Sequence, residues 1–177
     1  MNRTIELIPY DPAFEAQTAQ AYLDVFSTAE WSENLSLNDA LVQLHADSQH
    51  DGFGGVLIRA QGTIGGFSWW FDLTGNELNE RWRSRFAPRD SVPYPEGRGV
   101  FVIEFGIKPA LRGHGLGNRL LKATLEAIEP NHDWIALNTN KAAHAGLALL
   151  LSNGFVDLGL TGIQSANRIC LMKTIRR

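Results

Sequence analysis

The segment Arg112-Gly113-His114-Gly115-Leu116-Gly117 constrains the fold more than any other part of the chain. It lies between an apolar run, Phe101 to Ile107, and a helical pattern, Asn118 to Ile128, so it predicts a strand, a glycine-rich turn and the start of a helix. In such a turn several main-chain N–H groups can converge on an anion without intervening side chains, which favours a diphosphate ligand. Two other phosphate motifs do not fit, because Asn118 replaces the last glycine of G-x-G-x-x-G and no Gly-Lys-Ser/Thr is present.

Length and charge narrow the class of protein. The 177 residues suit one domain over residues 1–177, and a net charge of −3 argues against a general nucleic-acid binder. The longest apolar runs are far shorter than the ~20 residues that cross a bilayer, so we expect no membrane span. Met1 to Arg3 leads directly into a strand-like alternation, which predicts no secretory leader.

Cysteine and histidine usage argues against disulfides and metal sites. Cys170 is the only cysteine, which excludes an internal disulfide and fits a reducing cytoplasm. The five histidines show no metal-binding spacing, so we expect no metal ion and interpret them as surface residues.

Hydrophobic patterns predict alternating strands and helices typical of an α/β architecture. Helices are expected after Asp11-Pro12, after a capping box at Ser36 and Asp39, and over 115–128 and 141–152. The first of them has one apolar face at helical spacing, made by Phe14, Thr18, Tyr22, Val25 and Phe26. Residues 73–98 predict an inserted flap, with a polar helical piece around Glu77 to Phe86 followed by prolines and a glycine that break regular structure. We expect seven strands, over 5–10, 53–60, 63–71, 100–107, 134–139, 155–160 and 168–175, and Gln61-Gly62 suits a tight hairpin between the second and third.

Two motifs resemble one known family. The glycine segment matches Arg/Gln-x-x-Gly-x-Gly/Ala, the form in which the GNAT superfamily of N-acetyltransferases holds the pyrophosphate of acetyl-CoA. Leu137-Asn138-Thr139-Asn140, with a later helix ending at Asn153-Gly154-Phe155, is similar to a second family region. The resemblance implies an α/β GNAT acyltransferase fold, with a mixed, mostly antiparallel sheet of about seven strands flanked by about four helices. It also implies acetyl-CoA as co-substrate.

The resemblance assigns cofactor contacts residue by residue. The main chain of Phe105, Gly106 and Ile107 is expected to pair with the pantetheine arm. Asn140 matches an asparagine that binds the pantetheine chain or the strand end, although an ordinary turn asparagine is the alternative. The residues expected to hold the diphosphate are Arg112, Gly113, His114, Gly115, Leu116, Gly117 and Asn118.

One departure from the family concerns the general acid. Leu150 occupies the position where many members carry the tyrosine that protonates the departing thiolate. Tyr94 in the flap is a possible substitute, and solvent protonation is another because a thiolate is a fair leaving group.

Glu104 is the candidate general base, because it is the only charged residue in the apolar strand Val100 to Ile107. Desolvation in such a strand raises the pKa of a carboxyl toward the working pH of a base. A buried salt bridge to Arg59 or Arg168 is the alternative.

Aromatic and acidic residues predict where the acceptor binds. Trp69 and Trp70 are adjacent on one strand, so they point to opposite faces and one of them can line an acceptor cleft. Trp31, with Glu30 and Glu33, would suit a cationic amine. The substrate-binding candidates are Trp31, Trp70 and Asp72.

These features together favour an acetyl-CoA-dependent N-acetyltransferase that moves an acetyl group to a primary amine of a small molecule. Attack is expected to be direct, within a ternary complex, with Cys170 as a core residue rather than a nucleophile. A non-catalytic acyl-CoA-binding or regulatory domain is an alternative that Leu150 favours. A protein lysine or N-terminal acetyltransferase is another, which the flap disfavours. The resemblance further implies a possible homodimer, and the sequence leaves the acceptor and the acyl chain length open.

Overall fold

The computed structural model describes residues 4–28, 31, 34–87 and 95–175 of the chain. Its contacts divide the chain into two compact units, which we call the first and second units. The first comprises Met1–Phe71 and Ile103–Ala127, and the second comprises Asp72–Val102 and Ile128–Arg177. The expectation of one domain over residues 1–177 stays a prediction.

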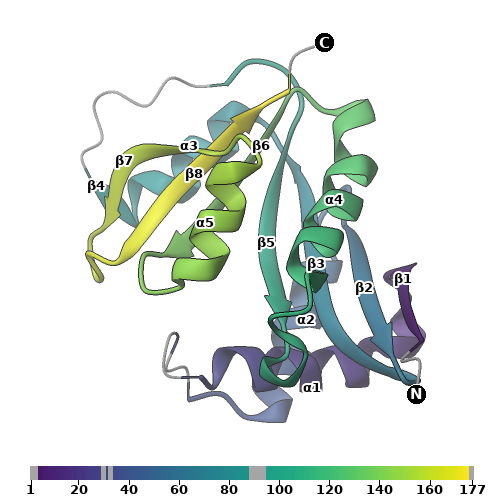
Figure 1. Ribbon diagram of the computed structural model, residues 1–177. Helices are drawn as coiled ribbons and strands as arrows, with labels where there is room; N and C mark the ends of the chain where they lie inside the picture. Colours follow the sequence, from purple (N-terminus) through teal and green to yellow (C-terminus); the bar gives the residue numbers. More distant parts are fainter. Residues whose placement is uncertain (1–3, 29–30, 32–33, 88–94, 176–177) are drawn as a thin grey trace. The chain divides into compact units, whose positions relative to one another are not determined.

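The first unit contains the strands β1, β2 and β3, the end of β5, and three helices (Figure 1). The strand order is β1-β2-β3-β5, with antiparallel pairing of β1 with β2 and of β2 with β3. The bounds are β1 (Ile5–Pro9), α1 (Glu15–Phe26), α2 (Leu37–Ser48), β2 (Gly54–Ala60), β3 (Thr63–Leu73), β5 (Gly99–Ile107) and α4 (Leu116–Ile128).

Local signals set several of these bounds. The Asp11 carboxylate accepts a hydrogen bond from the Ala13 N–H at 2.8 Å, which caps a short 3-10 turn before α1. Ser36 and Asp39 form the predicted capping box of α2. Gln61 and Gly62 join β2 to β3 with φ values of 53° and 80°, and two positive φ values in a two-residue loop define a type I′ hairpin turn.

An aromatic core fills the first unit between the sheet and the helices α1 and α2. Tyr22 and Phe26 of α1 pack on Phe67 and Trp69 of β3, and all four side chains are at most 6% exposed. The helical spacing of the α1 residues predicts this face. Side chains of β3 therefore fix where α1 lies.

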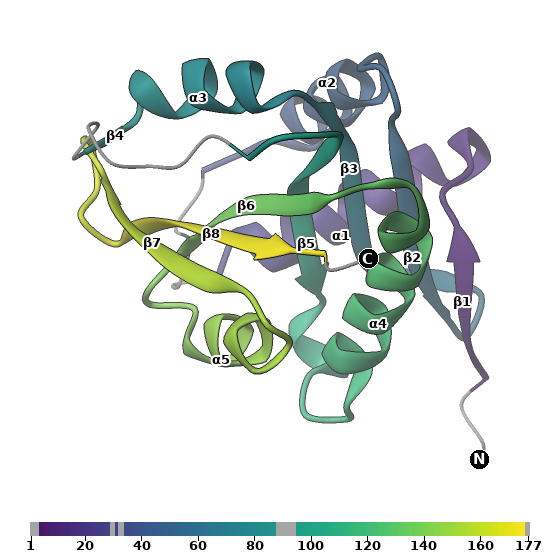
Figure 2. The same cartoon turned by 90° about the horizontal axis from the view of Figure 1, so that it is seen from above.

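The second unit contains strands from the later half of the chain, with α3 and α5 on opposite sides of β6, β7 and β8 (Figure 2). The order is β5-β6-β8-β7-β4, where β5 and β6 are parallel and the other pairs are antiparallel. The bounds are α3 (Gly75–Arg83), β4 (Phe86–Ala87), β6 (Trp134–Asn140), α5 (His144–Ser152), β7 (Val156–Gly162) and β8 (Arg168–Thr174).

The first half of the segment predicted as a flap is packed secondary structure. Thr74 and Glu77 form a second capping box at the start of α3. Leu78 and Trp82 on one face of α3 are at most 4% exposed, and the Trp82 indole donates to Asn138 Oδ1 at 2.9 Å. The helical piece expected around Glu77 to Phe86 is therefore present as α3, which begins earlier, at the capping box, and buries an apolar i, i+4 pair.

The mixed, mostly antiparallel sheet is confirmed, but the strand count differs from the expected number. Among the described residues there are eight strands and five α-helices rather than about seven and four, because β4 and α3 lie in the predicted flap. No helix among these residues is long and apolar enough to span a bilayer.

Candidate functional site

The glycine segment forms an open turn between β5 and α4 in the first unit. Residues Arg112 to Gly115 are exposed, and Gly113 and Gly115 have φ values of 78° and 71°. A Cβ built on either glycine meets no other atom within 4 Å. The left-handed backbone explains the need for glycine, and the empty space beside it leaves the main chain accessible to a ligand.

Helix α4 begins directly at this turn. The Gly115 carbonyl accepts from the Arg119 N–H at 3.2 Å, so it closes the first turn of the helix. The N–H groups of Leu116, Gly117 and Asn118 belong to the first turn, where an α-helix supplies no acceptors of its own. The positive end of the helix dipole lies at the same place, and both features are favourable to an anion.

Side chains at the turn are held by main-chain carbonyls. The Arg112 Nε donates to the Ile107 carbonyl at 3.1 Å, which turns this guanidinium back toward the end of β5. The His114 Nδ1 lies 2.8 Å from the Arg112 carbonyl. His114 is therefore part of the turn's own hydrogen bonding.

Close packing fixes the strand that leads into the turn. A Cβ on Gly106 would lie 2.8 Å from Val25 and 2.9 Å from Phe67, so only glycine lets β5 approach α1 this closely. The Lys108 N–H donates to the Gly65 carbonyl at 2.9 Å, and its ammonium pairs with Asp24 at 2.9 Å. The sequence does not indicate that Lys108 and Asp24 form an ion pair beside the turn, because the two residues lie 84 positions apart.

Glu104 lies half-buried on β5 and faces α1. The Tyr22 hydroxyl donates to Glu104 Oε1 at 3.4 Å, a long hydrogen bond. Arg59, one of the two arginines considered as its partner, pairs instead with Glu6, with its Nε 2.8 Å from Glu6 Oε2. The pairing with Tyr22 was not predicted, because only the tertiary structure brings α1 beside β5.

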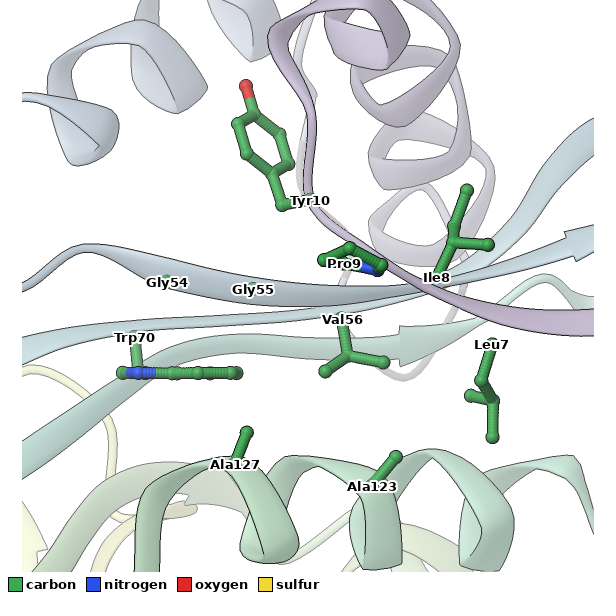
Figure 3. Close-up of a pocket in the computed structure, with 10 residues that line it drawn as sticks. All are labelled: Leu7, Ile8, Pro9, Tyr10, Gly54, Gly55, Val56, Trp70, Ala123 and Ala127. Atoms are coloured by element: carbon green, nitrogen blue, oxygen red, sulfur yellow. The ribbon is translucent and has the colours of Figure 1, made fainter. Parts of the chain in front are cut away.

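The adjacent tryptophans point to opposite faces of β3, as their alternation predicts. Trp69 faces α1, whereas Trp70 lines an apolar pocket of about 470 Å³ between the strands and α4. Figure 3 shows Trp70 and Val56 pointing toward Ala123 and Ala127 of α4. Trp70 is 8% exposed and lies on the opposite face of the sheet from α1, the helix that Glu104 contacts.

Other residues expected around the acceptor lie in different environments. Trp31 is partly buried, and its ring lies edge-on to Phe26 at 5.1 Å. Glu30, Glu33 and Tyr94 lie outside the described residues.

Asp72 is part of an ion-pair cluster in the second unit. Its carboxylate accepts from Arg98 at 2.9 Å and lies 3.0 Å from His132 Nε2, while His132 Nδ1 lies 2.8 Å from the Ile128 carbonyl. The expectation that the histidines are surface residues is wrong for His132, which is 7% exposed. It is buried because both of its ring nitrogens have polar partners there.

The segment Leu137 to Asn140 and the helix end at Asn153-Gly154-Phe155 also lie in the second unit. The Asn140 Oδ1 accepts from the Ala142 N–H at 2.9 Å, which is an ordinary asparagine turn that delays the start of α5 to His144. Leu150 on α5 is 6% exposed and has no proton to donate. The side-chain oxygen of Asn140 therefore already accepts a hydrogen bond within its own turn.

Cys170 is confirmed as a core residue, because it is fully buried and burial raises the pKa of its thiol. A raised pKa keeps the thiol protonated and makes it a poor nucleophile. Within the described part of the chain, no group of three His, Cys, Asp or Glu side chains is placed to hold a metal ion.

Several solved structures that are similar to this chain are named as acetyltransferases. A GNAT-family acetyltransferase from Staphylococcus aureus Mu50 has a TM-score of 0.69 at 14% identity, over 98% of this chain and 100% of that chain. The ribosomal-protein-S18-alanine N-acetyltransferase of Escherichia coli has a TM-score of 0.69 at 12% identity, over 98% and 96% of the two chains. The PaiA N-acetyltransferase of Thermoplasma acidophilum, in complex with coenzyme A, has a TM-score of 0.66 at 11% identity, over 97% and 99%.

No protein-family model matches the sequence, and no curated protein matches it either. The structural similarity extends over nearly the whole length of both chains in each comparison. The chain therefore has the GNAT acetyltransferase fold.

Proposed function

We propose that this protein is an acetyl-CoA-dependent N-acetyltransferase acting on a primary amine of a small molecule. The observation that carries the proposal is the open glycine turn at the start of α4, with left-handed Gly113 and Gly115 and free space beside both. In the proposed complex the N–H groups of the turn and of the first turn of α4 bind the diphosphate. The GNAT fold and the coenzyme A complex of the Thermoplasma acidophilum protein support this assignment.

The strand before the turn has the proposed role of binding the pantetheine arm through its main chain. The parallel pairing of β5 with β6 covers Gly99 to Val102, so Phe105, Gly106 and Ile107 follow the last residue of that ladder. Asn140 is a further proposed contact of the arm, although its carbonyl oxygen already accepts from Ala142.

Glu104 is the proposed general base. Its carboxylate takes one proton from the substrate ammonium, and the amine nitrogen then attacks the thioester carbonyl carbon. A C–N bond forms, the C–S bond breaks, and the nitrogen passes its second proton to solvent as the thiolate leaves. Leu150 cannot protonate the thiolate, so the thiolate takes its proton from solvent in this proposal.

Acceptor contacts are proposed at Trp31 and Asp72. An aromatic ring and a carboxylate both attract a cationic amine, although the Asp72 carboxylate is already shared by Arg98 and His132. Trp70 is a weaker choice, because its ring lies in the pocket beside α4 and not on the face of the sheet that meets α1 (Figure 3).

Thiol release from acetyl-CoA tests the proposed function. The purified protein is incubated with a panel of polyamines, aminoglycosides, amino acids and short peptides, and free thiol is measured with a chromogenic disulfide. We expect release with at least one small amine. If the protein binds acetyl-CoA but releases no free thiol with any of these acceptors, the proposal is contradicted.

A second candidate is a non-catalytic acyl-CoA-binding domain, which the buried Leu150 favours. This candidate predicts calorimetric binding of acetyl-CoA with no thiol release. A third candidate is protein acetylation, since the Escherichia coli protein of the same fold is by name an N-acetyltransferase of a ribosomal protein. Release only with peptides would favour the third candidate. A cytoplasmic location and a homodimer are parts of the same proposal that fractionation and light scattering test.

A further inference from the structure

We infer that Tyr22 is a positioning residue for Glu104, so that a side chain of α1 sets the protonation behaviour of the proposed base. The inference rests on the proposed function, and its starting observation is the hydrogen bond from the Tyr22 hydroxyl to Glu104 Oε1. The two residues are 82 positions apart, so only the fold brings them together.

The phenol ring of Tyr22 is held on several sides. It is 6% exposed, with ring centroids 4.5 Å from Phe26, 6.0 Å from Phe67 and 5.9 Å from Trp69. A ring packed this closely has little freedom to rotate away. The hydroxyl at its end is therefore fixed relative to β5, and a buried hydroxyl is stable where it meets an acceptor.

Helix α2 holds the ring of Trp69, against which Tyr22 packs, through Asp47. The Trp69 indole donates to Asp47 Oδ2 at 3.0 Å, and the Gln43 amide donates to Asp47 Oδ1 at 2.8 Å. Asp47 is 5% exposed, so its carboxylate depends on these donors. Trp69 is thus held in place, and Tyr22 stacks against it. The arrangement connects α2, β3 and α1 to the carboxylate on β5.

Other charged groups of these elements have partners of their own. Lys108 pairs with Asp24 of α1, and Asp47 binds Gln43 and Trp69. Glu15 of α1 lies 3.7 Å from His45 of α2. The described part of β3 in the first unit, residues 63–71, carries no ionisable side chain. The Tyr22 hydroxyl is a hydrogen-bond donor through which α1 acts on Glu104.

A hydroxyl that donates to a carboxylate stabilises the ionised form and makes the carboxyl more acidic. Removal of the hydroxyl should move the protonation of Glu104 to higher pH, by at most about one unit because the hydrogen bond is long. A base that protonates at higher pH is inactive over a wider acidic range. A residue that only filled the core would leave this titration unchanged.

The test compares Tyr22→Phe with the control variant Tyr10→Phe. Each variant removes one tyrosine hydroxyl, but Tyr10 is partly exposed and packs edge-on to Phe53, with ring centroids 5.3 Å apart. Protein labelled with 13C at the glutamate carboxyls is titrated by NMR, with Glu104→Gln to assign the signal. We expect the Glu104 midpoint to rise measurably, by at most about one pH unit, in Tyr22→Phe and to stay constant in Tyr10→Phe. Equal midpoints in wild type and Tyr22→Phe would overturn the inference, whether or not the protein is active.

Kinetics give the second measurement. With the acceptor that gives the fastest thiol release, Tyr22→Phe should move the acid limb of the kcat profile to higher pH while the affinity for acetyl-CoA stays the same. Circular dichroism confirms that both variants are folded. Coincident profiles would also overturn the inference. An inactive wild type with a shifted midpoint would instead refute the proposed function while leaving the Tyr22–Glu104 interaction established.

Discussion

Replacing Gly115 with valine separates backbone approach from side-chain charge at the proposed diphosphate site. Gly115 has a φ of 71°, and a Cβ there meets nothing within 4 Å, so Gly115→Val costs backbone strain rather than a clash. Such strain is about 1–3 kcal/mol and is present with and without ligand, so it lowers the melting temperature by a few degrees.

The affinity loss has a different origin. The added methyl groups occupy the space through which the diphosphate would reach the amides, and a lost hydrogen bond to a charged group costs about 1.5–3 kcal/mol. The dissociation constant for acetyl-CoA should then rise about 10- to 100-fold. Arg112 is exposed, so Arg112→Ala should cost at most about 1 kcal/mol, or roughly fivefold.

Gly62→Val is the matched control. Gly62 has a φ of 80° and equally open surroundings, but it lies in the hairpin between β2 and β3. Calorimetric titration with acetyl-CoA should give wild-type affinity for Gly62→Val despite a similar loss of thermal stability. Equal affinity losses for Gly115→Val and Arg112→Ala, or wild-type affinity for Gly115→Val, would refute the reasoning.

Three further predictions concern the base, the core and the helix caps. Glu104→Gln should lower turnover at neutral pH with nearly unchanged acetyl-CoA affinity, and an unaltered pH–rate profile would remove Glu104 from the mechanism. Trp69→Phe should lower the free energy of unfolding by about 1–3 kcal/mol, because it leaves the buried Asp47 carboxylate with one donor fewer; a urea midpoint equal to wild type would contradict this. Ser36 and Thr74 donate hydrogen bonds to the carboxylates of Asp39 and Glu77, which lowers the pKa of both carboxyls in the folded state. Each capping box therefore stabilises its helix fully above the unfolded-state pKa. This stabilisation is lost as the pH falls through the lower folded-state pKa. Acid titration of the double variant Asp39→Asn, Glu77→Gln should therefore show a smaller fall in stability than wild type, and an equal fall would argue against the caps.

Elements specified by short-range signals could be predicted from the sequence. The capping box at Ser36, the hairpin at Gln61-Gly62 and the helix end at Asn153-Gly154 each depend on residues within a few positions of one another. Gly154 has a φ of 87°, as a helix end of this kind requires. The glycine turn belongs to the same class, since its strand, turn and helix are consecutive.

Features that depend on tertiary contacts could not be predicted. The burial of His132 depends on Asp72, which lies 60 positions away, and nothing near His132 in the sequence indicates it. The same holds for Tyr22, whose spacing identifies a core face of α1 but not the carboxylate that its hydroxyl meets. Helix α3 is an intermediate case, because a polar helical piece was predicted around Glu77 to Phe86 but its start at the Thr74-x-x-Glu77 capping box and its packing were not.

Calorimetric titration with coenzyme A and with pantetheine, in wild type and in Gly115→Val, tests the central claim most directly. The two ligands share the thiol arm, and only coenzyme A carries the diphosphate with its phosphorylated adenosine, so the variant assigns the difference to the turn. If main-chain N–H groups of the turn and of α4 bind that diphosphate, coenzyme A should bind saturably, at least tenfold more tightly than pantetheine, and Gly115→Val should remove most of the difference. Equal affinity for the two ligands, or no measurable binding of coenzyme A, would contradict the account.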